Sequence, residues 1–196
     1  MKLIPVPTDL KTGDIVLFSG RCKVARTIQL LTWCKWSHVG MIIIDDEHGV
    51  LCYESTHNDR VAGVYIKRKI KGVHAVPLNE RLSGYKGDMA IQRLCGVNII
   101  GYDLDRFHKF REDVEGTEFE KNFKEPFLSM FKSVKNIHSE IFMYCTELLG
   151  LSHVKLGVLE SNYPVHKITP ADYAKGKVKL RVGYLDKPDL VKEYSK

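Results

Sequence analysis

Three side chains of this 196-residue sequence have the residue types of a thiol nucleophile and its base: His38, Glu54 and, far downstream, Cys145. A histidine can accept the proton of a thiol. A carboxylate can hold the other ring nitrogen, which fixes the tautomer and stabilises the imidazolium. The set predicts a site for nucleophilic attack on a carbonyl, with its members in the order His, Glu, Cys.

A predicted β-hairpin determines whether His38 and Glu54 can meet. Apolar runs at 39–44 and 50–53 flank the turn-forming stretch 45–49. A turn centred on residue 46 places residue 38 opposite Glu54. A turn centred on residue 47 places residue 38 opposite residue 56, with Glu54 a diagonal neighbour on the same face. Both registers bring the carboxylate within reach of the imidazole, whereas a half-integer centre separates them.

Cys145 is expected to open a helix that ends near Leu156. Unpaired amides and the positive dipole end of a first helical turn favour a thiolate. The backbone N–H of Cys145 is then expected to help hold a developing oxyanion. Four further residues are candidates for a second oxyanion donor or for the pocket wall: Trp36, Ser37, Tyr53 and Tyr144.

Each residue also has an ordinary structural interpretation. A histidine at the start of a strand is usually structural, and Glu54 could pair with Lys67 or Arg68 on the surface. A cysteine on an apolar helix is usually a packed core thiol. The alternative to an enzyme is therefore a non-catalytic binding or structural module, for example a virion component.

The remaining pattern predicts an α+β chain that forms one domain over 1–196. A fraction of 44% hydrophobic residues is enough to fill a core. Further strands are expected at 13–18, 61–69, 72–77 and 89–94, and helices at 22–31 and 102–115. An aromatic-rich mixed segment follows at 118–135, then a turn at 169–173 and an edge strand at 179–184.

The cysteines indicate whether disulfides or a zinc site are expected, and the apolar runs indicate the cellular compartment. The five cysteines are odd in number and irregularly spaced, which argues against a disulfide framework, and no Cys-x-x-Cys pair suggests zinc. We expect no metal and no cofactor. No stretch is typical of a signal peptide or a transmembrane span, so a cytoplasmic protein is expected, or a virion protein if the chain is viral.

The net charge of +6 is densest at Lys67, Arg68, Lys69 and Lys71. This cluster could contact an anionic surface, although lysines that protect a solvated strand edge are the simpler interpretation. Aromatic residues do not interleave with the basic ones as base stacking requires, so nucleic-acid binding is not favoured.

Five short motifs together resemble a known family. They are Gly13-Asp14-Ile15-Val16-Leu17, Trp36-Ser37-His38-Val39-Gly40, Glu54-Ser55-Thr56, Gly72-Val73-His74-Ala75-Val76-Pro77-Leu78 and Tyr144-Cys145-Thr146-Glu147-Leu148. In this order they look like the circularly permuted papain-like (NlpC-type) proteins of the YiiX-like and poxvirus branch. Relatives of lecithin:retinol acyltransferase share the His-before-Cys order, whereas papain-type enzymes place the cysteine first.

The resemblance covers residues 13 to about 159 and has consequences for fold and function. It implies an antiparallel sheet packed on the helix that carries Cys145, with His38 and Glu54 completing the site. It also implies an amide or ester hydrolase or acyltransferase that acts on a peptide or lipid through a thioester.

Overall fold

The computed structural model describes residues 2–57, 60–117 and 137–194, with the backbone alone for 137–144. It shows a mixed α/β arrangement in which every strand pair of the main sheet is antiparallel. The sheet has the order β1-β9-β6-β2-β3-β4-β5. Its strands are β1 (Lys2–Leu3), β2 (Ile15–Ser19), β3 (His38–Asp45), β4 (Gly49–Thr56), β5 (Gly72–Pro77), β6 (Asp88–Gln92) and β9 (Asp189–Glu193).

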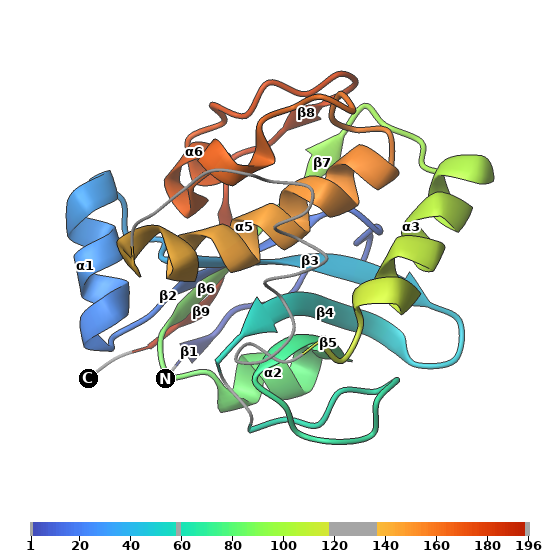
Figure 1. The fold of residues 1–196 in the computed structure, drawn as a ribbon. Helices are drawn as coiled ribbons and strands as arrows, with labels where there is room; N and C mark the ends of the chain where they lie inside the picture. The colour runs from blue at the N-terminus through green and yellow to red at the C-terminus, as the bar shows by residue number, and fades with distance from the viewer. Residues whose placement is uncertain (1, 58–59, 118–136, 195–196) are drawn as a thin grey trace.

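The helices lie around this sheet, with α5 (Ile137–Lys155) running along β3 in Figure 1. Helices α1 (Lys23–Thr32) and α3 (Tyr102–Val114) lie near opposite ends of α5. The other elements are α2 (Leu78–Gly84), α6 (Pro170–Ala174), the 3-10 turn Val165–Lys167 and a small sheet of β7 (Leu94–Cys95) with β8 (Tyr184–Leu185).

Alternation along the strands gives the sheet two apolar faces. Ile15, Leu17 and Met41 pack with Leu148 and Leu149 of α5 in the larger cluster of buried residues. The intervening strand residues, such as Val16, Phe18 and Cys52, pack with Leu78 and Leu82 of α2 in a second cluster. The sheet is therefore covered by α5 on one face and by α2 on the other.

The predicted hairpin is confirmed, and its register is the one centred on residue 47. Met41 pairs with Tyr53, Ile43 with Leu51 and Asp45 with Gly49. Gly49 has φ +75, and the Asp45 carboxylate accepts the backbone N–H groups of Glu47 and His48, which together set the turn. Glu54 is thus the diagonal neighbour of His38.

Two residues of the first motif join the sheet to its surroundings. Gly13 has φ +100, a conformation that favours glycine, and its carbonyl accepts a hydrogen bond from His153 of α5 at 3.0 Å. The buried Asp14 carboxylate accepts the backbone N–H of Leu94 at 2.8 Å and pairs with Arg93 at 2.9 Å.

Several expectations about elements are corrected by the structure. Residues 61–69 form turns rather than a strand, because Lys67 N–H bonds back to the Gly63 carbonyl and Lys67 takes φ +51. Helix α2 and strand β9 were not expected. The C-terminal strand buries Lys192, whose ammonium group donates to the carbonyls of Leu82 and Tyr85 at the end of α2. The aromatic segment at 118–135 lies outside the described residues.

The helix of Cys145 begins earlier than expected. The sequence predicts a start at the cysteine itself, but α5 begins at Ile137, about two turns before it. None of the helices that the structure describes is long and apolar enough to cross a membrane.

Candidate functional site

His38 and Glu54 form a close contact at the start of β3. His38 Nε2 lies 2.7 Å from Glu54 Oε2, and the Glu54 side chain is fully buried whereas that of His38 is 19% exposed. The short distance and the buried carboxylate describe a charge-assisted hydrogen bond. The contact predicted from the hairpin is thus present.

Arg81 holds the other side of the Glu54 carboxylate. Arg81 Nη2 donates to Glu54 Oε2 at 3.0 Å, and Arg81 Nε lies 2.5 Å from Glu54 Oε1. The guanidinium comes from α2, on the face of the sheet opposite to α5, and stacks over the Phe18 ring. Burial alone would raise the pKa of Glu54. Arg81 and then His38 outweigh it and lower that pKa to about 2, so the carboxylate is charged at neutral pH.

Cys145 reaches the histidine from the other face of the sheet. It is 4% exposed and belongs to the apolar cluster under α5. Its side chain forms a hydrogen bond with the His38 side chain. His38, the first residue of β3, therefore bridges the carboxylate and the thiol.

The electrostatics of this group favour a charged histidine. Burial opposes the charge on His38, but the Cys145 and Glu54 side chains outweigh it and raise the pKa of His38 to about 9. The charged ring is favoured by the Cys145 side chain that it hydrogen-bonds and by the Glu54 carboxylate. In proteins generally, a neighbouring imidazolium lowers the pKa of a cysteine thiol and makes it more reactive.

The position of Cys145 within α5 changes one part of the expected chemistry. In the interior of a helix, the backbone N–H of residue 145 is committed to the carbonyl four residues earlier. The helix dipole acts mainly within the first turn, which lies at Ile137. The expected oxyanion donor and the dipole contribution are therefore wrong, and the polar partner that the structure gives the thiol is His38.

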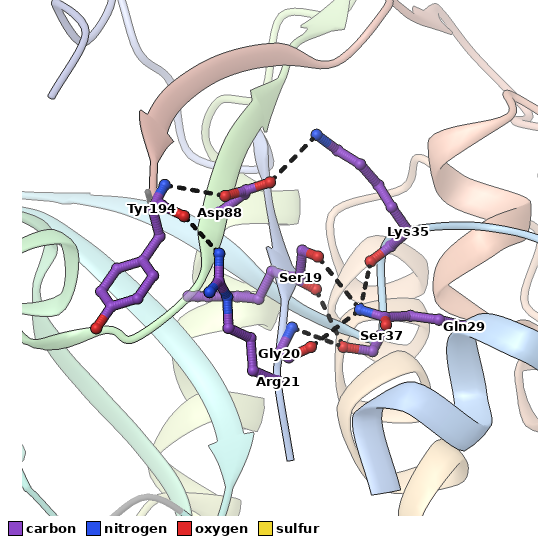
Figure 2. A network of polar contacts seen from close by, with 9 residues as sticks. Ser19, Gly20, Arg21, Gln29, Lys35, Ser37, Asp88 and Tyr194 are labelled. Atoms are coloured by element: carbon purple, nitrogen blue, oxygen red, sulfur yellow. Dashed lines mark hydrogen bonds and ion pairs between the residues drawn. The ribbon is translucent and has the colours of Figure 1, made fainter. Parts of the chain in front are cut away.

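The four secondary candidates have other surroundings. The Ser37 hydroxyl accepts the Gly20 N–H at 3.0 Å and donates to the Phe18 carbonyl at 3.4 Å, so it joins β2 to β3 (Figure 2). Trp36 is buried in the α5-side cluster. The Tyr53 hydroxyl lies among Glu115, Arg111 and Tyr65, where burial raises its pKa. The Tyr144 side chain lies outside the described residues.

The structure also bears on two other predictions, the absence of a metal site and the basic cluster. Among the residues that the structure describes, no group of three or more His, Cys, Asp or Glu side chains is arranged to hold a metal ion. Lys67, Arg68 and Lys69 are exposed on the turn segment that replaces the predicted strand, and Lys71 is exposed just before β5. The surface interpretation expected Glu54 to pair with Lys67 or Arg68, whereas in the structure Glu54 pairs with Arg81.

A cavity of about 300 Å³ lies at the other end of β3. It is lined by Leu10, Lys11, Thr12, Ile44, Leu94, Val97, Asn98, Ile99 and Leu104. Ile44 and His38 lie near opposite ends of the same strand, so this cavity is separate from the Cys145–His38 pair.

Arg81 is the member of the candidate site that the sequence did not reveal. Leu78 and Leu82 stand four residues apart before Gly84, which is the signal of a short amphipathic turn. A seven-residue helix carries too little periodicity to separate it from a loop, and an arginine on it is ordinarily solvated. Only the packing of α2 against β4 and β5 shows that this guanidinium is buried.

Comparison with known proteins gives a limited result. No protein-family model matches this chain, and no curated protein does. Among solved structures, the chain is similar to the metalloprotein YiiX from Escherichia coli O157:H7. The match has 15% sequence identity, covers 93% of this chain and 97% of that chain, and has a TM-score of 0.49.

Proposed function

We propose that this protein is a thiol-dependent enzyme that hydrolyses, or transfers the acyl group of, an amide or ester in a peptide or lipid. Cys145 is the nucleophile, His38 is the general base and acid, and Glu54 orients His38. One observation carries the proposal: the His38 ring contacts the Glu54 carboxylate at 2.7 Å and hydrogen-bonds the Cys145 side chain.

The chemistry follows from these roles. His38 accepts the thiol proton, and the sulfur of Cys145 attacks the carbonyl carbon to form a C–S bond. The tetrahedral adduct expels the amine or alcohol, which takes the proton from His38 and leaves a thioester. Neutral His38 then accepts a proton from water or from an acceptor alcohol or amine as that group attacks. Cleavage of the thioester restores Cys145.

The proposal includes a permuted papain-like arrangement. An antiparallel sheet with the histidine on β3, the acid on β4 and the cysteine on a later helix packed against that sheet supports it. The chain order His, Glu, Cys is the order that such a permutation produces.

Selective alkylation of the native protein tests whether Cys145 is activated. The chain has internal controls, because Cys22 is exposed, Cys34 and Cys95 are partly buried, and Cys52 is buried with its pKa raised by burial. We expect limiting iodoacetamide near neutral pH to modify the buried Cys145 faster than the exposed Cys22, as measured by peptide mass spectrometry. His38→Gln should slow labelling of Cys145 at least about tenfold and leave Cys22 unchanged.

The outcome separates an enzyme from a structural module. The near-complete burial of Cys145 is the observation that favours a packed core thiol. Labelling in order of exposure, with Cys145 and Cys52 equally slow, would support the structural module and contradict the proposal. Fluorogenic amide and ester substrates with peptide and lipid acyl groups complete the test, since Cys145→Ala should abolish turnover while Cys22→Ser should not.

A further inference from the structure

Helix α1 and the residue that ends it expose large apolar side chains on one surface. Leu30 is 71% exposed, Leu31 64% and Trp33 86%. The buried residues of the same helix, Ala25 and Ile28, face the protein, so these leucines project from the solvent side. Scattered single apolar residues on a surface are ordinary, but three within four positions form a patch that calls for a partner. We refer to Leu30, Leu31 and Trp33 as the α1 patch.

Trp33 occupies a backbone position that does not favour it. As the C-cap of α1 it has φ 48 and ψ 44, the left-handed region in which glycine or asparagine is preferred. A bulky aromatic residue there is held in an unfavourable conformation with its ring in solvent. Neither helix capping nor core packing accounts for tryptophan at this position.

The segment that carries the α1 patch has charge of one sign. Between Asp14 and Asp45 the sequence has no acidic residue and four basic ones, Arg21, Lys23, Arg26 and Lys35. All four are exposed, although Lys35 lies 3.6 Å from Asp88. A helix that combines exposed leucine and tryptophan with lysine and arginine matches the interface of an anionic bilayer, in which the apolar side chains insert and the cations meet lipid headgroups.

The helix is firmly attached to the strands that hold the site. Gln29 Nε2 lies within 3.2 Å of Ser19 Oγ, 3.0 Å of the Gly20 carbonyl and 2.8 Å of the Lys35 carbonyl (Figure 2). From α6, Lys175 Nζ donates to the Thr32 carbonyl at 3.0 Å, at the end of α1. A surface bound through the α1 patch is thus fixed relative to β2 and to the start of β3, where His38 lies.

We propose that the α1 patch and its basic neighbours form a docking surface for an anionic lipid bilayer, on which α1 lies in the plane of the headgroups. The proposal goes beyond the thiol chemistry and does not depend on it. Charge complementarity selects this partner: an anionic bilayer matches the acid-free segment 15–44, whereas a second copy of the same surface would bring like charges together.

Vesicle sedimentation with the full chain tests the proposal. We expect binding to vesicles of phosphatidylcholine and phosphatidylserine mixed about three to one, and at least about tenfold weaker binding to pure phosphatidylcholine or in high salt. Leu30→Glu with Leu31→Glu should weaken binding to the anionic vesicles at least about tenfold. Trp33→Asn should also weaken it, and since asparagine tolerates the left-handed conformation this variant keeps the cap.

Matched controls identify the surface that binds. Ile100→Glu changes a residue that is 66% exposed and comes two positions before α3, which lies near the opposite end of α5 from α1 in Figure 1, and it should bind like the parent. Replacing Lys67, Lys69 and Lys71 by glutamine tests the other basic cluster and should have a smaller effect than the α1 changes. Cys145→Ala should bind normally, which separates docking from the proposed reaction.

Three results would overturn the proposal. The first is absence of binding to anionic vesicles. The second is binding that the α1 variants retain. The third is a dimer, seen by analytical ultracentrifugation of the parent and abolished by the leucine changes without any vesicle binding; a second copy would then cover the patch.

Discussion

His38 connects two sides of the candidate site, and its charge state depends on both. Nε2 faces Glu54 at 2.7 Å, and Cys145 hydrogen-bonds the same ring. Arg81 is a positioning residue in this scheme, because it touches the carboxylate and not the thiol. It fixes the carboxylate plane and keeps Glu54 ionised, so the negative charge that supports the imidazolium persists well below neutral pH.

Glu54→Gln should lower the pKa of His38. Glutamine can still hydrogen-bond the ring and Arg81, but it removes the carboxylate charge, which together with the larger effect of the Cys145 side chain raises this pKa to about 9. We expect the pKa of His38 to fall by at least about 1 when the ring is followed by NMR against pH. In the proposed mechanism His38 must carry a proton to release the leaving group, so the alkaline limb of activity should shift to lower pH as well.

Glu80→Gln is the matched control for this change. Glu80 is an exposed carboxylate on α2, one residue before Arg81. The Glu80→Gln change should leave the pKa of His38 unchanged. An unchanged pKa in the Glu54→Gln protein would mean that Glu54 does not support the charge on His38, which would remove the acid from the proposed site.

At the level of elements, local patterns predicted the hairpin well and the helix limits poorly. Alternation and turn residues left two registers that bring His38 and Glu54 together, and the structure has one of them. No signal marked the beginning of α5, because apolar residues precede Cys145 as well as follow it. Residues 61–69 form turns instead of the expected strand because of local hydrogen bonds, which the alternating pattern of the sequence does not reveal.

The junction between α2 and β6 gives a test of close packing. A Cβ at Gly87 would lie 2.2 Å from the Ser19 carbonyl oxygen of β2, a backbone atom that cannot move away cheaply. Gly87→Ala should therefore lower the free energy of unfolding by about 1–3 kcal/mol in urea denaturation. Gly84→Ala is the control, since a Cβ there meets nothing within 4 Å. We expect it to be neutral or to stabilise by up to about 1 kcal/mol. Equal effects of the two changes would show that β6 can move away from β2.

Across the whole molecule, burial favours the neutral form of several titratable groups, and their contributions to stability change with pH in opposite directions. Burial raises the pKa of Glu115 and of Glu147 to about 7, so their ionisation opposes folding as the pH rises from 4.5. Burial lowers the pKa of His153 to about 4 although the Gly13 carbonyl raises it, so protonation of His153 opposes folding as the pH falls. A plain pH–stability curve mixes these contributions, and a difference between two variants is needed to isolate one of them.

His153 provides that difference, because it is fully buried where α5 meets β2 and α6. Its Nε2–H donates to the Gly13 carbonyl at 3.0 Å, which leaves Nδ1 to accept the Tyr173 hydroxyl at 3.5 Å. The neutral ring fits these partners, and a second ring proton would require the Tyr173 hydroxyl to turn from donor to acceptor. In the unfolded chain the ring binds a proton below about pH 6.5, while the folded protein resists protonation down to about pH 4. Its contribution to stability is therefore present above pH 6.5 and is lost as the pH falls through about 4.

His153→Gln keeps an N–H donor for Gly13 but cannot titrate. The difference in unfolding free energy between the parent and this variant should be constant above about pH 6.5. Between about pH 6.5 and about pH 4, the parent should lose roughly 3 kcal/mol of unfolding free energy relative to the variant. Urea denaturation at a series of pH values measures it, and Glu115 and Glu147 cancel because both proteins contain them. A difference that does not vary with pH would mean that His153 takes up its proton as readily in the folded protein as in the unfolded one. Helix α5, which carries Cys145 eight residues earlier, would then not be anchored to β2 through a neutral imidazole.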